Sequence, residues 1–122
     1  MDKILIVDDS LSIRQMVEHT LATAGYATTT AEDGDVALNI AEKEDAFDLV
    51  ITDINMPNMD GISLIKALRQ MGKYQFRPIL VLTTESGTEK KMEGKAAGAT
   101  GWIVKPFVPE QLVSVAQQVL QK

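Results

Sequence analysis

Five residues whose side chains can do chemistry each stand just after a short apolar run of the sequence. They are Asp8, Asp9, Asp53, Thr83 and Lys105. Carboxylates can bind a hard cation or act as nucleophiles, while a hydroxyl and an ammonium group can hydrogen-bond an anion. An all-oxygen ligand set with neither His nor Cys suits Mg²⁺, which retains waters and leaves room for phosphate oxygens. These residue types therefore indicate a magnesium site with space for phosphate.

The apolar runs before these residues have the composition of buried parallel strands. They are near-continuous rather than alternating, which indicates strands covered on both faces, and they occupy residues 4–7, 49–51, 79–82 and 102–104. A fifth, weaker strand is predicted at 26–30, where β-branched but more polar residues are typical of an edge strand.

Segments with helical spacing separate the strands. Apolar residues recur at intervals of three and four, and they predict amphipathic helices over 13–24, 36–41, 62–68, 88–97 and 112–120. The helix ends have their own signals: Gly25 ends the first helix, and Pro109 suits the first turn of the last. We expect N-caps for the second, third and fourth helices at Asp33, Asp60 and Thr88.

Alternating strands and helices predict an α/β fold, a doubly wound parallel sheet with helices on both faces. The 122 residues suffice for one domain, and a closed eight-fold barrel would need roughly twice that length. In such a sheet ligands bind beyond the carboxyl ends of the strands, where the reactive residues stand. If the first and third strands are neighbours, about 4.8 Å apart, Asp8, Asp9 and Asp53 share one cleft.

Three carboxylates in one cleft repel one another, since two like charges roughly 4 Å apart cost about 4 kcal/mol at an effective dielectric near 20. Lys105 can supply one counter-charge and Mg²⁺ a second. Taken singly, each residue has an ordinary alternative role. Asp8 and Asp9 could form a turn or cap a helix, and Asp53 could start a loop. Thr83 could be a packing residue and Lys105 a solvated charge. Their joint placement on one rim favours the site.

The amino-acid composition excludes several classes of protein. Twelve Lys and Arg against seventeen Asp and Glu give a net charge of −5, which opposes nucleic-acid binding. Cysteine is absent, which excludes disulfides and thiolate metal sites and suits a reducing compartment. No apolar run is long enough for a signal peptide or a membrane span. We expect a soluble cytoplasmic protein with neither nucleic-acid nor membrane partners.

The motifs resemble the receiver domain of bacterial two-component response regulators over essentially the whole chain, residues 1–122. The match comprises ILIVDD at 4–9, TDINMPNMDG at 52–61, Thr83 after ILVL, and KPF at 105–107. The resemblance implies one receiver domain with the CheY-like, flavodoxin-like strand order 2-1-3-4-5 and five helices.

Carried over residue by residue, the resemblance implies that Asp53 accepts a phosphoryl group from a phosphohistidine of a sensor histidine kinase. Asp9, Asp53 and the main-chain carbonyl of Asn55 would bind Mg²⁺, with Asp8 acting through a water. Lys105 would pair with the aspartyl phosphate. Such a domain catalyses only its own phosphorylation and dephosphorylation, and is not otherwise an enzyme.

Other residues would set the response. Thr83 would swing to hydrogen-bond the phosphate, and the Lys105-Pro106 peptide would be cis. Trp102 stands where the family more commonly has Tyr or Phe, so it is either the switching aromatic or a large core side chain. Asn55 and Glu85 would flank the mouth of the site and position a water, which gives a short-lived phosphoprotein.

The run TTES at 83–86 and the chain length most resemble stand-alone chemotaxis receivers. The implied partners of such a monomer are a CheA-like kinase, a flagellar motor switch protein and a phosphatase, with output around the fourth helix, fifth strand and fifth helix. A phosphorelay intermediate, phosphate sink, adapter or truncated receiver of a longer regulator remain alternatives.

Two rival classes fit less well. A Mg²⁺-dependent phosphohydrolase would place its nucleophile after the first strand with a second Asp two residues later, whereas Asp8 and Asp9 are adjacent. An unphosphorylated interaction module would not need the complete reactive set. Neither GxGxxG nor GxxxxGK[ST] occurs, which argues against nucleotide binding.

Overall fold

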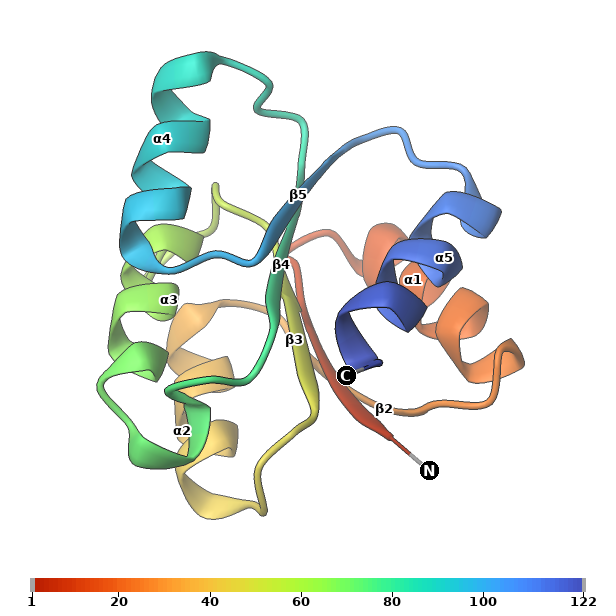
Figure 1. The fold of residues 1–122 in the computed structure, drawn as a ribbon, viewed down its shortest axis with the longest axis horizontal. Helices are drawn as coiled ribbons and strands as arrows, with labels where there is room; N and C mark the ends of the chain where they lie inside the picture. The colour runs from red at the N-terminus through yellow and green to blue at the C-terminus, as the bar shows by residue number, and fades with distance from the viewer. Residues whose placement is uncertain (1, 122) are drawn as a thin grey trace.

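A computed structural model describes residues 2–121 and places one five-stranded parallel sheet at the centre of the molecule (Figure 1). The strand order is β2-β1-β3-β4-β5, which confirms the predicted fold class. The strands are β1 (Lys3–Val7), β2 (Ala27–Ala31), β3 (Leu49–Thr52), β4 (Ile79–Thr83) and β5 (Gly101–Val104). The weak strand β2 lies at an edge, as its polar composition predicts.

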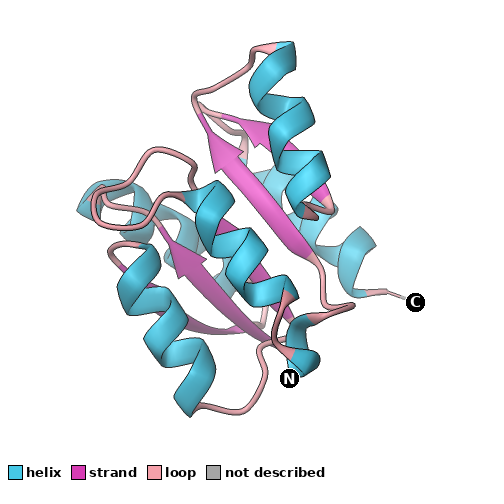
Figure 2. Ribbon diagram, turned by 90° about the vertical axis from the view of Figure 1, so that its left-hand side faces the viewer, coloured by secondary structure: helices cyan, strands magenta, loops and turns pink. Residues whose placement is uncertain are grey.

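In residues 2–121, four α-helices connect the strands, a fifth follows β5, and together they cover both faces of the sheet (Figure 2). Helices α1 and α5 lie on one face, and α2, α3 and α4 lie on the other. The helices are α1 (Leu11–Thr23), α2 (Gly34–Lys43), α3 (Gly61–Arg69), α4 (Thr88–Ala97) and α5 (Pro109–Leu120), with a 3-10 turn η1 (Gly72–Tyr74) before β4. In residues 2–121 no helix is long and apolar enough to cross a membrane.

The sheet separates two hydrophobic cores. Along β1, Ile4 and Ile6 belong to the core under α1 and α5, whereas Leu5 and Val7 belong to the core under the other three helices. Successive side chains of a strand point to opposite faces, so both sets are buried. This double burial is why the strand sequences are continuously apolar.

Three of the four residues predicted to start helices are confirmed in that role, and the one at α4 is wrong. The carboxylates of Asp33 and Asp60 accept from the main-chain N–H groups of Val36 and Ser63, and Pro109 begins α5. Thr88, expected as an N-cap, is instead the first residue of α4. Gly87 is the cap, because the N–H of Lys91 already donates to the Gly87 carbonyl and closes the first turn there.

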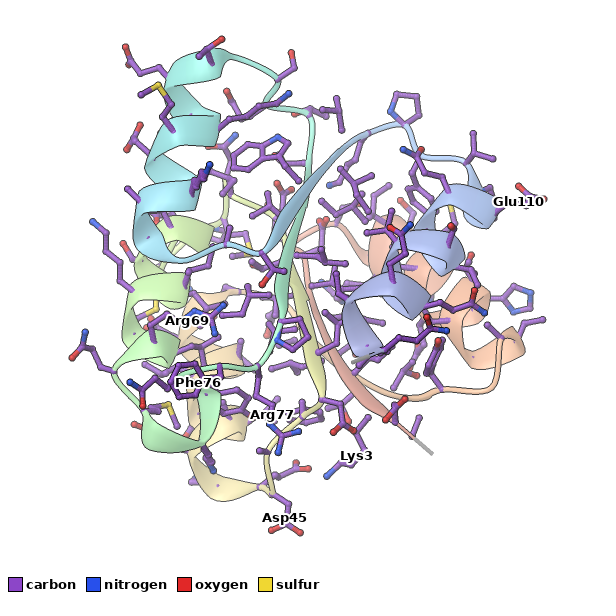
Figure 3. All side chains as sticks on the ribbon, viewed as in Figure 1. Lys3, Asp45, Arg69, Phe76, Arg77 and Glu110 are labelled. Carbon is purple, nitrogen blue, oxygen red and sulfur yellow. The ribbon has the colours of Figure 1, made fainter. Side chains whose placement is uncertain are left out.

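Arg69, the last residue of α3, lies at the amino edge of the sheet, where the strands begin (Figure 3). Its side chain hydrogen-bonds to segments from other parts of the chain. Its Nη1 donates to the carbonyl oxygens of Tyr74 at 2.7 Å and Arg77 at 2.6 Å. Its Nε and Nη2 donate to the carbonyl of Gly98, which follows α4, at 3.1 and 2.7 Å. Burial lowers the pKa of Arg69, but these carbonyls satisfy its charged N–H groups.

Candidate functional site

The carboxyl ends of β1 and β3 bring Asp8, Asp9 and Asp53 together. These neighbouring strands pair Val7 with Thr52, so the residues that follow them emerge side by side. One carboxylate oxygen from each Asp lies within 4.8 Å of the other two, which confirms the predicted cluster. Asp8 and Asp53 are buried, whereas Asp9 is exposed.

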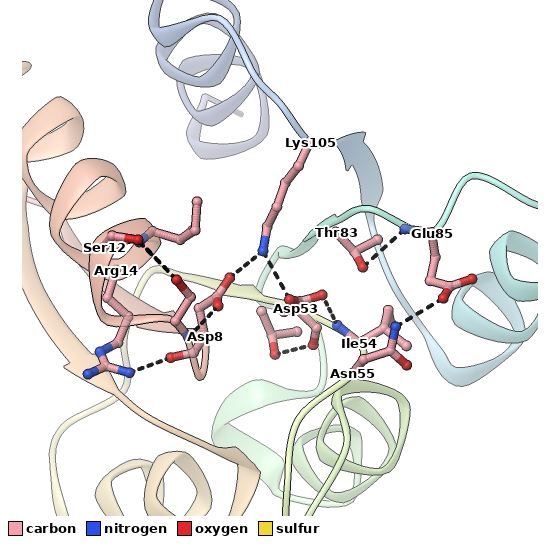
Figure 4. Close-up of polar contacts among 12 residues, drawn as sticks. Asp8, Ser12, Arg14, Asp53, Ile54, Asn55, Thr83, Glu85 and Lys105 are labelled. Atoms are coloured by element: carbon pink, nitrogen blue, oxygen red, sulfur yellow. Dashed lines mark hydrogen bonds and ion pairs between the residues drawn. The ribbon is translucent and has the colours of Figure 1, made fainter.

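Lys105, in the loop after β5, places its ammonium group against two of these acids (Figure 4). Its Nζ donates to Asp8 Oδ2 at 2.6 Å and to Asp53 Oδ2 at 3.0 Å. Burial lowers the pKa of Lys105, but its hydrogen bonds to the two carboxylates and their charges together raise that pKa above its usual value. Lys105 is therefore a protonated donor, as the charge argument requires.

The same cluster is an unfavourable place for a carboxylate. Burial raises the pKa of Asp8, and the hydrogen bonds from Lys105 and from the N–H of Ser10 lower it by less. Three carboxylates face one ammonium group here, so negative charge remains in excess. An all-oxygen, negatively charged donor set is what Mg²⁺ prefers, and the residues present fit that ion.

Main-chain contacts fix both acidic loops. After β1, the N–H of Ser10 donates to Asp8 Oδ1 at 2.9 Å, and Arg14 Nη1 donates to the Asp8 carbonyl at 2.7 Å. After β3, the N–H of Asp53 donates to the Val7 carbonyl at 2.9 Å. Contacts within the fold therefore hold the carboxylates of the cluster in place.

Sequence reasoning missed Arg14. The available signal was its charge: a cation in the second turn at the N-terminal end of α1 opposes the helix dipole, so it needs a local partner. The partner here is a main-chain carbonyl, which no side-chain pattern reveals.

The remaining predicted residues meet at Glu85. Its N–H donates to the buried hydroxyl of Thr83 at 3.3 Å, and its carboxylate accepts from Asn55 Nδ2 at 3.0 Å (Figure 4). Its carbonyl accepts from the indole N–H of Trp102 at 2.9 Å. One residue therefore contacts all three, from the mouth of the site to β5.

Trp102 is half-buried against α4. A Cβ at Gly94, in the middle of that helix, would lie 2.5 Å from the indole ring. Only glycine leaves room for this ring in this position. The Lys105-Pro106 peptide that follows β5 is cis, as the resemblance implies.

Comparison with known proteins agrees with this geometry. The response regulator receiver domain matches residues 4–117. Chemotaxis protein CheY-3 of Vibrio cholerae is 40% identical over 98% of this chain and 92% of its own. The structure of Vibrio cholerae chemotaxis protein CheY4 is 58% identical, covers 98% of both chains and superposes with a TM-score of 0.93.

A more distant structure carries a metal. The receiver domain of sensor histidine kinase PA1611 from Pseudomonas aeruginosa has a magnesium ion coordinated in its active-site cleft. It is 27% identical, covers 98% of this chain and 97% of its own, and superposes with a TM-score of 0.90. Fold, acidic cluster and sequence match agree, and this chain belongs to the response regulator receiver domain family, among its CheY-like members.

Proposed function

We propose that this chain is a phosphoacceptor signalling domain that takes a phosphoryl group onto Asp53 from the phosphohistidine of a sensor histidine kinase. The observation that carries the proposal is the cluster of Asp8, Asp9 and Asp53 with Lys105 bonded across it. An Asp53 oxygen forms the new bond to phosphorus as the bond from phosphorus to the histidine nitrogen breaks, and the imidazole takes up a proton.

The residues around Asp53 have separate tasks. Asp9, Asp53 and the Asn55 carbonyl would hold Mg²⁺, with Asp8 acting through a water. When bound, the ion neutralises the phosphoryl oxygens and leaves the chain's own groups to position them. Lys105 already donates to Asp53 and can pass to a phosphoryl oxygen with little movement. The magnesium in the PA1611 receiver domain supports this assignment.

The output would start at Thr83. Its hydroxyl accepts from Glu85, and turning toward a phosphoryl oxygen would break that bond and move the Glu85 main chain, to which Trp102 is bonded. The change would reach the surface around α4, β5 and α5. Asn55 and Glu85 would orient or exclude the water that removes the phosphoryl group, giving a lifetime of roughly seconds to minutes.

The names of the similar proteins support a role in chemotaxis. The partners would be a CheA-like kinase, a flagellar motor switch protein and a phosphatase, with the domain acting as a monomer and without further enzymatic activity. A phosphoprotein that persists for hours would instead favour a relay, sink or adapter receiver, or the receiver of a longer regulator.

Phosphorylation with acetyl phosphate and Mg²⁺ tests the proposal. The wild type should gain one phosphoryl group by intact mass, and hydroxylamine should remove it because it is an acyl phosphate. The Asp53→Asn variant should gain none. Asp48→Asn is the matched control, since Asp48 pairs with Arg77 at the opposite edge of the sheet. Modification of Asp53→Asn at the wild-type rate would reject Asp53 as the acceptor.

A further inference from the structure

The loop from Asp53 to Asp60 is anchored at its start by the neighbouring strand β1 and by the first residue of α3. The N–H of Asp53 donates to the Val7 carbonyl, and the N–H of Gly61 donates to the Ile54 carbonyl at 2.8 Å. These contacts fix the phosphoacceptor itself. They leave the segment that carries the Asn55 carbonyl to be held from elsewhere.

The second anchor comes from the start of α2, on another strand connection. Asp33 Oδ2 accepts from Asn58 Nδ2 at 2.7 Å, and the N–H of Gly34 donates to the Met59 carbonyl at 3.2 Å. A Cβ at Gly34 would lie 2.5 Å from the Met59 carbonyl oxygen, so the two backbones are in close contact. Asn58 adopts the left-handed conformation, with φ of 68°, that turns its amide toward Asp33.

Helix capping alone does not account for Asp33. Asp60 caps α3 in the same way from an exposed position, with a single hydrogen bond to the N–H of Ser63. Asp33 is only 6% exposed, and it divides its two oxygens between the N–H of Val36 and the side chain of Asn58. The hydrogen bonds of Asp33 lower its pKa, with the Val36 N–H the largest contributor and Asn58 the next.

We propose that Asp33 is a positioning residue for the phosphorylation site: through Asn58 it holds the segment that presents the Asn55 carbonyl to the magnesium ion. This inference rests on the proposed function. Asp33 touches neither the metal ligands nor the reacting atoms, and it acts by fixing the main chain of the loop. Loss of a hydrogen bond made directly to a metal ligand typically weakens metal binding by about 10- to 100-fold, and a contact that acts through the loop main chain should fall at the lower end of that range.

Two variants separate the loop anchor from the other roles of these residues. Asp33→Ser keeps a side-chain oxygen for the cap of α2 but is too short to reach Asn58. Asn58→Gly keeps the left-handed conformation but removes the amide. Asp35→Ser is the matched control, because Asp35 is an exposed acid in the same first turn of α2.

Three measurements on the full chain test the proposal. We expect both variants to weaken Mg²⁺ binding roughly tenfold by isothermal titration calorimetry. We also expect faster amide hydrogen exchange in residues 55–59 of the metal-free protein, with the control unchanged in both. The double variant should bind Mg²⁺ as either single variant does, because both remove one contact. Urea unfolding confirms that each variant is folded.

Unchanged Mg²⁺ affinity and unchanged exchange in both folded variants would overturn the proposal, as would additive losses in the double variant. Failure of the proposed function has a different signature. In that case the wild type would bind no Mg²⁺ and accept no phosphoryl group, while the exchange measurement would still report whether Asp33 holds the loop.

Discussion

Arg69 and Lys105 are both partly buried cations at opposite edges of the sheet, yet their surroundings differ. Within residues 2–121, the acceptors of Arg69, at the amino edge of the sheet, are neutral main-chain carbonyls, those of Tyr74, Gln75, Arg77 and Gly98. Lys105, at the carboxyl edge, meets two carboxylates with a third beside them. The carbonyl dipoles satisfy the N–H groups of Arg69 without a counter-ion, whereas the acid cluster keeps an excess of negative charge.

This difference separates stability from binding. Carbonyls that satisfy a cation require nothing further, so the Arg69 contacts join α3, η1 and α4 whether or not a ligand is present. At the acid cluster, burial raises the pKa of Asp8 and the charge of Asp53 adds a smaller increase, so the charged carboxylates there gain most from an added cation. The fold concentrates stabilising contacts at one edge and binding capacity at the other.

The largest expected effect is at the amino edge. Arg69→Ala should lower the free energy of unfolding by about 3 kcal/mol, because it removes several charged hydrogen bonds to partly buried carbonyls. Urea denaturation measures this. Arg77→Ala is the control, because its ion pair with Asp48 is open to solvent, with the two side chains 42% and 32% exposed, and its loss should cost no more than about 1 kcal/mol. Equal losses of unfolding free energy in Arg69→Ala and Arg77→Ala would contradict the view that the Arg69 contacts stabilise this edge of the sheet.

A smaller effect of opposite sign is expected at the carboxyl edge. In metal-free protein, Asp9→Asn should raise the free energy of unfolding by about 1 kcal/mol, since it relieves repulsion at an exposed position. The same variant should lose most of the rise in melting temperature that millimolar Mg²⁺ gives the wild type. Thermal unfolding with and without Mg²⁺ reports both, and a variant that still responds fully to Mg²⁺ would remove Asp9 from the ligand set.

The smallest effect is a pH dependence of the same edge. The pKa of Asp8 is higher in the folded protein than its ordinary value of 3.8. At pH values between the ordinary and the raised pKa, the folded state therefore binds more protons than the unfolded state. This contribution therefore stabilises the wild type as pH falls through that window. Metal-free Asp8→Asn should be the more stable protein near neutral pH, and its advantage should shrink in acid. Urea unfolding of both proteins at several pH values measures this difference. A stability advantage of Asp8→Asn that grows in acid would contradict the raised pKa of Asp8.

The strands and the reactive residues could be predicted because their signals are local. The run at 4–7 is apolar throughout because β1 is buried on both faces, and the positions of Asp53 and Lys105 follow from the strand ends. The strand order came from the resemblance, not from periodicity. Sequence reasoning placed the N-cap of α4 at Thr88, one residue too late, since cap preference cannot distinguish the last non-helical residue from the first helical one.

Contacts between distant segments could not be predicted. The partners of Arg69 and Trp102 are main-chain carbonyls, which every residue has and no sequence pattern marks. Asp33 was correctly predicted as a cap, but its second contact, to Asn58, depends on how two separate loops approach one another. Sequence patterns therefore located the chemistry, while the groups that hold it in place depend on tertiary structure.

The close fit between Gly94 and Trp102 couples the changes that these two positions can undergo over evolutionary time. Gly94→Ala would favour the helix by roughly 1 kcal/mol, but the new methyl group would overlap the indole ring. Replacing Trp102 first with a smaller ring would leave a void beside Gly94. Each first step is unfavourable while the joint change is not, so lineages that exchange the tryptophan should also exchange the glycine.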